Sequence, residues 1–218
     1  MLQTQTIEPS ILDLLKSLMS RDYLDGFNLV GGTALALYLG HRKSMDIDLF
    51  SESGFDVAQM IDKIQNDFPL QLYFTSANTI KGSINNINVD IIAHRYPSLN
   101  EIKIIDGIRI SSEPDIIAMK LNAISISGQR SKDFIDIYFI LEDHKYGVAD
   151  MLKFYQTKYS QHGDMHVLKS LIYFNDVDLS DWPVLIKKPH LKWPVVISRI
   201  EKEVLRFVKE QVQTNDER

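Results

Sequence analysis

The sequence contains no cysteine. This absence excludes a disulfide framework, a thiolate nucleophile and a zinc site with cysteine ligands, and it is consistent with a reducing compartment. A run of about 18 apolar residues is also missing, so no transmembrane helix is expected. The first fifteen residues, MLQTQTIEPSILDLL, lack a basic start followed by an apolar stretch, so we expect no signal peptide. These absences predict a cytoplasmic protein with no membrane partner.

A strong excess of positive charge is missing as well. The 24 Lys and Arg residues are outnumbered by 29 Asp and Glu, for a net charge of -5. This balance argues against a protein that coats nucleic acid without sequence preference. Residues 182–209 are a local exception, with seven basic residues against two glutamates. They form a candidate surface for an anion, although a solvated helix face and loop is the simpler explanation.

The hydrophobic pattern predicts a chain of two halves, with mixed α/β structure over residues 1–111 and helices over residues 112–218. Expected helices cover residues 9–24, 34–39 (opened by 31–33), 53–66, 113–126, 132–141, 147–159, 165–171 and 195–212. Expected strands cover residues 27–30, 45–50, 70–75, 79–84, 87–93, 102–105 and 108–110. Asn85-Asn86 and Asp106-Gly107 are typical hairpin turns. We therefore predict an α+β fold, in which a mixed β-sheet with flanking helices is followed by a helical region.

Two aspartates, Asp46 and Asp48, alternate with apolar residues in one expected strand. Side chains at positions i and i+2 of a strand share a face. Two adjacent carboxylates repel each other and are costly to bury without a partner. A divalent cation removes this conflict, and Mg²⁺ prefers such hard oxygen ligands. The alternative is an exposed edge strand that binds no metal.

A third acid, Asp90, is the lone carboxylate of the apolar strand that contains Val89 and Ile91. Three aspartates on neighbouring strands could hold two metal ions about 3.5–4 Å apart, an arrangement used in phosphoryl transfer. The alternative for Asp90 alone is an acid near a strand end.

The turn Gly31-Gly32-Thr33 lies between a strand and a helix. Glycines there allow a phosphate to approach the backbone, and the N–H groups and dipole of the helix start favour the anion. The Thr33 hydroxyl could cap the helix or bind the phosphate. The turn matches neither the P-loop nor the dinucleotide fingerprint, so a tight turn without a ligand is the alternative.

The helical half supplies further charged residues. Lys120 lies in an expected helix and could neutralise charge on a phosphate. Lys132, Asp133 and Asp136 begin the next helix, where Asp133 could act as a general base. The alternative for these three is a helix start with favourable acids in its first turn.

Long stretches of the sequence resemble the AbiEii/AbiGii-type nucleotidyltransferase toxins, a branch of the DNA polymerase β-like nucleotidyltransferase superfamily. The resemblance is carried by GGTALALYLGHRKSMDIDLF (31–50), VDII (89–92), DIIAMKLNAISISGQRSKDFIDIYFIL (115–141) and LKSLIYFNDVD (168–178). It extends over residues 29–178 and does not reach the C-terminal stretch.

The resemblance implies a role for each matching residue. Gly31, Gly32 and Thr33 would form the phosphate-binding turn, and Arg42 and Ser44 would line the site. Asp46, Asp48 and Asp90 would bind the metal. Lys120 would bind the nucleotide phosphates, while Lys132, Asp133 and Asp136 match a Lys-Asp-x-x-Asp motif in which Asp133 is the catalytic acid residue.

The resemblance further implies a nucleotidyltransferase core at residues 1–111 and a helical region at 112–218 that completes the active-site cleft. The expected reaction moves a nucleotide from an NTP to an acceptor hydroxyl, with Mg²⁺ or Mn²⁺, and the expected acceptor is RNA such as tRNA. A toxin–antitoxin or phage-defence role would add a cognate antitoxin as a partner. The alternative is a nucleotide-binding or protein-interaction module of this fold without turnover.

Overall fold

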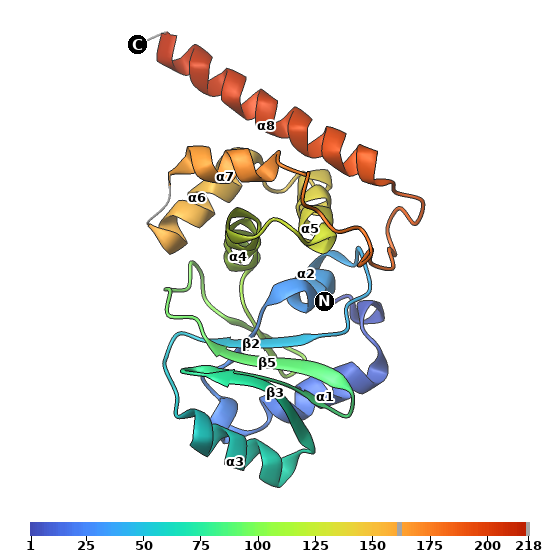
Figure 1. Ribbon diagram of the computed structural model, residues 1–218, viewed down its shortest axis with the longest axis vertical. Helices are drawn as coiled ribbons and strands as arrows, with labels where there is room; N and C mark the ends of the chain where they lie inside the picture. The colour runs from blue at the N-terminus through green and yellow to red at the C-terminus, as the bar shows by residue number, and fades with distance from the viewer. Residues whose placement is uncertain (161–162, 217–218) are drawn as a thin grey trace. The chain divides into compact units, whose positions relative to one another are not determined.

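The computed structural model describes residues 1–160 and 163–216. The chain divides into two compact units, Met1–Ile116 and Ile117–Arg218. Every strand of the described residues lies in the first unit, and the second is helical (Figure 1). The division falls within helix α4 (Glu113–Ile126), a few residues after the boundary that we expected at 111/112.

The first unit is built around a seven-stranded mixed sheet in the order β3-β4-β5-β2-β1-β7-β6. The pairs β2–β5 and β1–β7 are parallel, and the other neighbours are antiparallel. The strands are β1 (Asn28–Leu29), β2 (Ile47–Ser51), β3 (Leu70–Ser76), β4 (Thr79–Ile84), β5 (Ile87–Ala93), β6 (Lys103–Ile105) and β7 (Ile108–Ile110). The helices are α1 (Pro9–Met19), α2 (Gly31–Leu39) and α3 (Val57–Asp67), with short 3-10 turns at Thr4–Thr6 and Asp22–Leu24.

The two faces of this sheet differ in chemistry. Ile47 and Leu49 of β2 are fully buried, whereas Asp48, between them, is only half-buried. Helices α1 and α3 lie on one side of the sheet and α2 lies on the other (Figure 1). Because Asp48 packs against the start of α2, the acidic residues belong to the α2 side, and the apolar residues between them face α1 and α3.

Both expected hairpin turns are confirmed. Asn85 and Asn86 have φ of 52° and 65°, and Asp106 and Gly107 have φ of 53° and 81°. Two consecutive positive φ values define the type I′ turn, whose twist matches that of the flanking strands. The strands joined by the first turn, 79–84 and 87–93, have the expected bounds.

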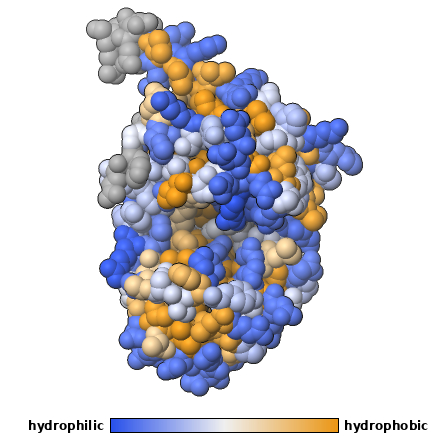
Figure 2. All heavy atoms as spheres, viewed as in Figure 1, coloured by the Kyte–Doolittle hydropathy of each residue, from blue (hydrophilic) through white to orange (hydrophobic). Residues whose placement is uncertain are grey.

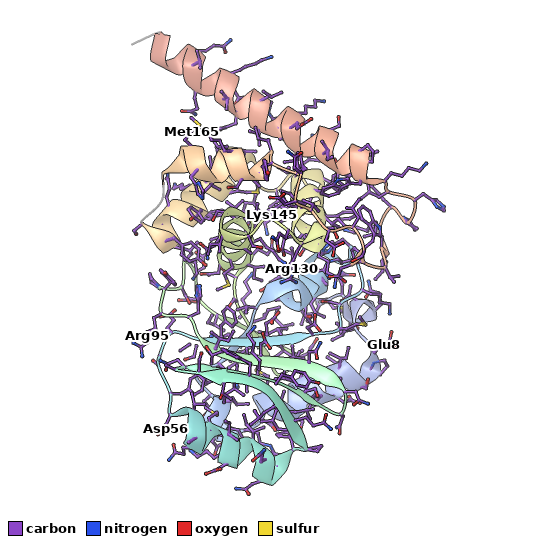
Figure 3. The ribbon with its side chains drawn as sticks, viewed as in Figure 1. Glu8, Asp56, Arg95, Arg130, Lys145 and Met165 are labelled. Atoms are coloured by element: carbon purple, nitrogen blue, oxygen red, sulfur yellow. The ribbon has the colours of Figure 1, made fainter. Side chains whose placement is uncertain are left out.

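Several helix and strand boundaries differ from the expected ones. Helix α1 ends at Met19 instead of Leu24, because the chain turns extended at Arg21. Helix α3 begins at Val57 instead of Ser53, because the Asp56 carboxylate caps it by accepting from the Gln59 N–H at 2.9 Å. Figure 3 labels Asp56 at this helix end.

The second unit contains α5 (Ser131–Glu142), α6 (Val148–Tyr159), α7 (Asp164–Leu171) and α8 (Trp193–Asp216) in addition to most of α4. Helix α8 packs against α5, α6 and α7. Its apolar residues recur every fourth position, and Val196, Ile200 and Val204 are buried while Val208 and Val212 are exposed. The predicted α+β fold, with a mixed sheet, flanking helices and a helical C-terminal region, is confirmed.

Candidate active site

Asp48 lies directly against the first residue of α2. The Val30 N–H donates to the Asp48 carbonyl at 2.9 Å, which brings the end of β1 beside β2. Gly31 then has a φ of 70°, and a Cβ on Gly31 would lie 2.2 Å from Asp48 Oδ2. Two separate reasons therefore require glycine at this position: its backbone conformation is unfavourable for other residues, and a side chain would collide with the carboxylate.

The next glycine is packed in a similar way against a cation. A Cβ on Gly32 would lie 2.3 Å from an Arg42 Nη atom. Arg42 is only 3% exposed, and its other Nη donates to the Lys43 carbonyl at 3.0 Å. The turn thus holds a carboxylate at its first glycine and a guanidinium at its second.

The Thr33 hydroxyl is bonded within the protein. It donates to the Asp46 carbonyl and lies 2.8 Å from the Ser44 hydroxyl, and the side chain is 1% exposed. The expectation that Thr33 caps α2 is wrong, because the N-cap position is Val30 and no side-chain cap bond forms there. Thr33 instead ties the segment before β2 to the start of α2.

Asp46 lies one residue before β2, so the prediction that Asp46 and Asp48 share one strand is corrected. Strand pairing begins at Ile47, because the Asp46 carbonyl is taken by Thr33. The Asp46 carboxylate accepts from the Asn88 Nδ2 at 3.0 Å, which directs it toward β5.

Asp48 and Asp90 are direct neighbours on the parallel strands β2 and β5. Paired residues of adjacent strands point to the same face, and like charges placed opposite each other are destabilising. Lys81 offsets this repulsion, because it pairs with Asp90 across β4 and β5 and its Nζ lies 2.6 Å from Asp90 Oδ2. The face thus carries a row of charges that runs across three strands.

The three acids do not form a ready-made metal cluster. Within residues 1–160 and 163–216, no three His, Asp or Glu side chains are grouped closely enough to hold an ion. The physical reason lies in their present partners: Asp90 is bonded to Lys81, and Asp46 is bonded to Asn88. The register of β2 and β5 brings Asp48 and Asp90 together, but the third carboxylate is not gathered with them.

Lys81 and Asn88 are site residues that the sequence analysis did not identify, although a signal was present. The turn at 85–86 makes Ile84 and Ile87 the first pair of the hairpin. Counting back along both strands from that pair places Ser83 opposite Asn88 and Lys81 opposite Asp90. A lysine opposite the suspected third acid was therefore predictable from the hairpin alone.

In the second unit, Lys120 lies against Asp133, with Asp136 beside them. Lys120 Nζ lies 2.6 Å from Asp133 Oδ1 and 2.8 Å from Asp136 Oδ2. The three side chains are only 7%, 6% and 0% exposed. Asp133 is in the first turn of α5, yet its burial goes beyond the simple helix-start explanation. The three residues form a buried ion cluster.

Lys132 points to a different partner from its neighbour Asp133. Its Nζ lies 2.7 Å from Asp181 Oδ1 in the segment before α8, and the two side chains are 20% and 56% exposed. Lys132 therefore does not belong to the buried cluster of Lys120, Asp133 and Asp136, and its expected role in nucleotide binding stays a prediction.

The basic stretch 182–209 is also engaged in ion pairs. Lys188 and Arg199 both bind Glu142, the last residue of α5. Arg199 and Arg206 both bind Glu203. Three of the seven basic residues are thus paired with glutamates of the second unit, which favours the helix-face explanation over an anion-binding surface for these three cations.

Two segments of the chain, residues 13–109 and 82–194, match the family described as "Nucleotidyl transferase AbiEii toxin, Type IV TA system". The chain belongs to the AbiEii nucleotidyltransferase toxin family. This AbiEii-family protein is thus a nucleotidyltransferase, and the family that its sequence resembles is confirmed.

The chain is also similar to individual proteins, one in sequence and others in fold. An uncharacterized protein of Aquifex aeolicus (strain VF5) is 33% identical over 171 residues, which cover 75% of this chain and 81% of that protein. JHP933 from Helicobacter pylori has a similar fold, with a TM-score of 0.54 and 16% identity over 96% of this chain and 98% of its own. The nucleotidyltransferase toxin MenT4 from Mycobacterium tuberculosis H37Rv matches with a TM-score of 0.54 and 13% identity over 82% and 74% of the two chains. In the described part of this AbiEii-family chain, no helix is both long and apolar enough to cross a bilayer.

Proposed function

We propose that this AbiEii-family protein transfers a nucleotide from an NTP to a hydroxyl of RNA, with tRNA as the acceptor, in a reaction that needs Mg²⁺ or Mn²⁺. The observation that carries the proposal is the position of Asp48. Its carboxylate lies against Gly31 at the start of α2 and opposite Asp90 on the neighbouring strand. The two candidate metal ligands therefore lie next to the glycine turn that would bind the phosphate.

The donor set fits a hard divalent cation. Asp46, Asp48 and Asp90 offer carboxylate oxygens, the ligands that Mg²⁺ and Mn²⁺ prefer. Asp90 Oδ2 is bonded to Lys81, which leaves Asp90 Oδ1 for a metal. A bound ion would offset the charge of the triphosphate and stabilise the leaving pyrophosphate.

The chain's own groups would orient the nucleotide. The backbone N–H groups at the start of α2, a helix of nine residues, favour an anion, and Arg42 beside Gly32 adds positive charge. The acceptor hydroxyl oxygen bonds to the α-phosphorus while the bond from that phosphorus to the bridging oxygen breaks, and pyrophosphate leaves with the electron pair. The family resemblance assigns the hydroxyl proton to Asp133 and phosphate binding to Lys120.

The proposal is tested by incubating the purified protein with each α-labelled NTP, Mg²⁺ and total RNA. We expect label in RNA, with loss of labelling on addition of EDTA. Asp48→Asn keeps the shape but removes the charge, and we expect it to lower transfer by about three orders of magnitude, or ~4 kcal/mol, with unchanged thermal stability. Transfer by Asp48→Asn at the wild-type rate would refute the site and favour a binding module without turnover. Label in protein instead of RNA would refute the acceptor.

We further propose that the protein acts as the toxin of a toxin–antitoxin or phage-defence system, as the description of its family suggests. Expression in a bacterial host is expected to arrest growth, and Asp48→Asn is expected to abolish the arrest. Relief of the arrest by the product of a neighbouring reading frame would identify the antitoxin. Equal arrest by both forms would show that toxicity does not depend on nucleotidyl transfer.

A further inference from the structure

Two exposed aromatic residues lie at the outer edge of the sheet. Strand β3 is the edge strand next to β4, and its Tyr73 and Phe74 are 64% and 54% exposed. Figure 2 shows hydrophobic surface gathered over this strand. Aromatic rings contribute most to stability when they are buried, so two consecutive exposed rings call for another explanation.

A β-bulge turns both rings to the same face. Leu72 pairs with Gly82 and Phe74 pairs with Lys81, so Tyr73 is the extra residue between them. Phe74 therefore shares the face of Lys81. The Tyr73 hydroxyl donates to Ser83 Oγ at 2.6 Å, and Ser83, two residues from Lys81 on β4, lies on that face too. Without the bulge, consecutive side chains would point to opposite faces.

The same face carries the candidate catalytic acids. The register places Asp48, Asp90, Lys81 and Phe74 in one row across β2, β5, β4 and β3. Neighbouring strands are about 4.8 Å apart, so the row is about 14 Å long. That length accommodates a few nucleotides of a single strand, whose terminal hydroxyl would lie at the acids while its bases reach the rings.

We infer that Tyr73 and Phe74 form a stacking platform for the unpaired end of the RNA acceptor, an inference that rests on the proposed function. Bases stack on exposed aromatic rings, and such surfaces bind single strands with little sequence preference. Three observations favour RNA over an added protein strand: the rings share the face of the acids, the bond to Ser83 orients the Tyr73 ring, and Lys81 supplies a cation between rings and acids. An added protein strand would require only the free backbone edge of β3.

The test uses the full-length protein and a labelled, unpaired oligoribonucleotide, with EDTA present and NTP absent. Binding is followed by fluorescence anisotropy. We expect Tyr73→Ala and Phe74→Ala each to raise the Kd at least about fivefold, and Phe74→Tyr to restore wild-type binding. Leu72→Ala is the matched control, because Leu72 is a 41% exposed apolar residue of the same strand on the opposite face. An unchanged Kd in both alanine variants, or an equal increase in Leu72→Ala, would overturn the platform.

A kinetic measurement separates this inference from the proposed function. In the transfer assay, the double variant Tyr73→Ala/Phe74→Ala is expected to raise the KM for RNA and to leave the KM for NTP unchanged. Loss of transfer in Asp48→Asn together with an unchanged KM for RNA in the double variant would leave the function standing and remove the platform. If the double variant binds RNA normally but loses a protein partner, the edge of β3 is a protein-binding site and the inference is wrong.

Discussion

Gly31 and Asp48 depend on each other at the scale of single residues. The αL-like backbone of Gly31 disfavours any side chain, and the nearby carboxylate occupies the space where a Cβ would lie. Gly107 offers a comparison, because its φ is 81° and nothing lies within 4 Å of its Cβ position. Both glycines have a positive φ that disfavours other residues. At Gly31, in contrast to Gly107, a side chain would also collide with a neighbouring group.

We predict that Gly31→Ala lowers nucleotidyl transfer at least about a hundredfold, because the new methyl group must displace the Asp48 carboxylate. Gly107→Ala is expected to cost a similar ~1 kcal/mol of backbone strain and to leave transfer unchanged. Initial rates of label transfer and thermal unfolding of both variants provide the measurement. Full activity in Gly31→Ala would show that the contact between Gly31 and Asp48 is unimportant for the reaction.

The ion pair of Lys81 and Asp90 explains how acids on adjacent strands coexist. Asp48 and Asp90 would otherwise face each other with like charge. The Lys81 ammonium is paired with Asp90, while Asp48 lies against the glycine turn. The register of the three strands thus determines which acid has Lys81 as its neighbour.

At the scale of elements, Glu142 joins α5 to α8 and to the segment before it. This carboxylate ends α5 and binds Lys188 and Arg199, while Arg199 also donates to the Leu141 carbonyl at 2.9 Å. The hydrogen bond from Lys188, together with the positive charge of Lys188 and Arg199, lowers the pKa of Glu142 below its usual value.

The lowered pKa of Glu142 determines whether folding stability rises or falls with pH. The folded state binds the Glu142 proton less tightly than the unfolded state, so the stabilisation is present above the ordinary pKa of glutamic acid and is lost as the pH falls through the lowered value. We predict that Glu142→Gln lowers stability at pH 7 by no more than about 1 kcal/mol, since its main partner Lys188 is 49% exposed and solvent screens their interaction. The difference from wild type should vanish in acid.

Thermal unfolding of wild type and Glu142→Gln between pH 3 and pH 7 provides the measurement. Glu201→Gln is a suitable control, because Glu201 is an exposed glutamate of α8. A difference in Tm between Glu142→Gln and wild type that stays constant down to pH 3 would contradict the assignment of the stabilisation to the charged form of Glu142.

At the scale of the whole molecule, the buried ion cluster ties the second unit together. Lys120 binds carboxylates from two turns of α5, and all three side chains are nearly inaccessible to solvent. Removing one partner of a buried ion cluster is strongly destabilising, because the remaining charges lose their compensation. A loss of activity on mutating Lys120 therefore has a structural explanation as well as a catalytic one.

We predict that Lys120→Met destabilises the protein by about 3–5 kcal/mol, visible as a large fall in Tm. Lys132→Met is the matched control: its partner Asp181 is 56% exposed, so solvent screens the ion pair and the effect should stay within about 1 kcal/mol. A Lys120→Met protein that melts like wild type but no longer transfers nucleotide would show that Lys120 acts on substrate alone. Measuring Tm and transfer for both variants distinguishes the two roles.

The sequence predicted several helices and strands correctly where their ends carry characteristic turn or capping residues. The type I′ turns at Asn85-Asn86 and Asp106-Gly107 set the hairpins, and helix α4 has the expected bounds of 113–126. One strand boundary was predicted wrongly because of a side chain from a distant part of the chain. Strand β2 begins late because Thr33 takes the Asp46 carbonyl, and no pattern within residues 45–50 contains that information.

By itself, the sequence determined the family, the fold class and the set of chemically active residue types, because these depend on the order of apolar, glycine and acidic residues along the chain. Only the tertiary structure decided which groups meet. The parallel pairing of β2 and β5 sets Asp48 opposite Asp90, and the close approach of α2 sets Gly31 against Asp48. Parallel strands are joined by long connections, so their register is set by packing of the whole sheet rather than by any local turn.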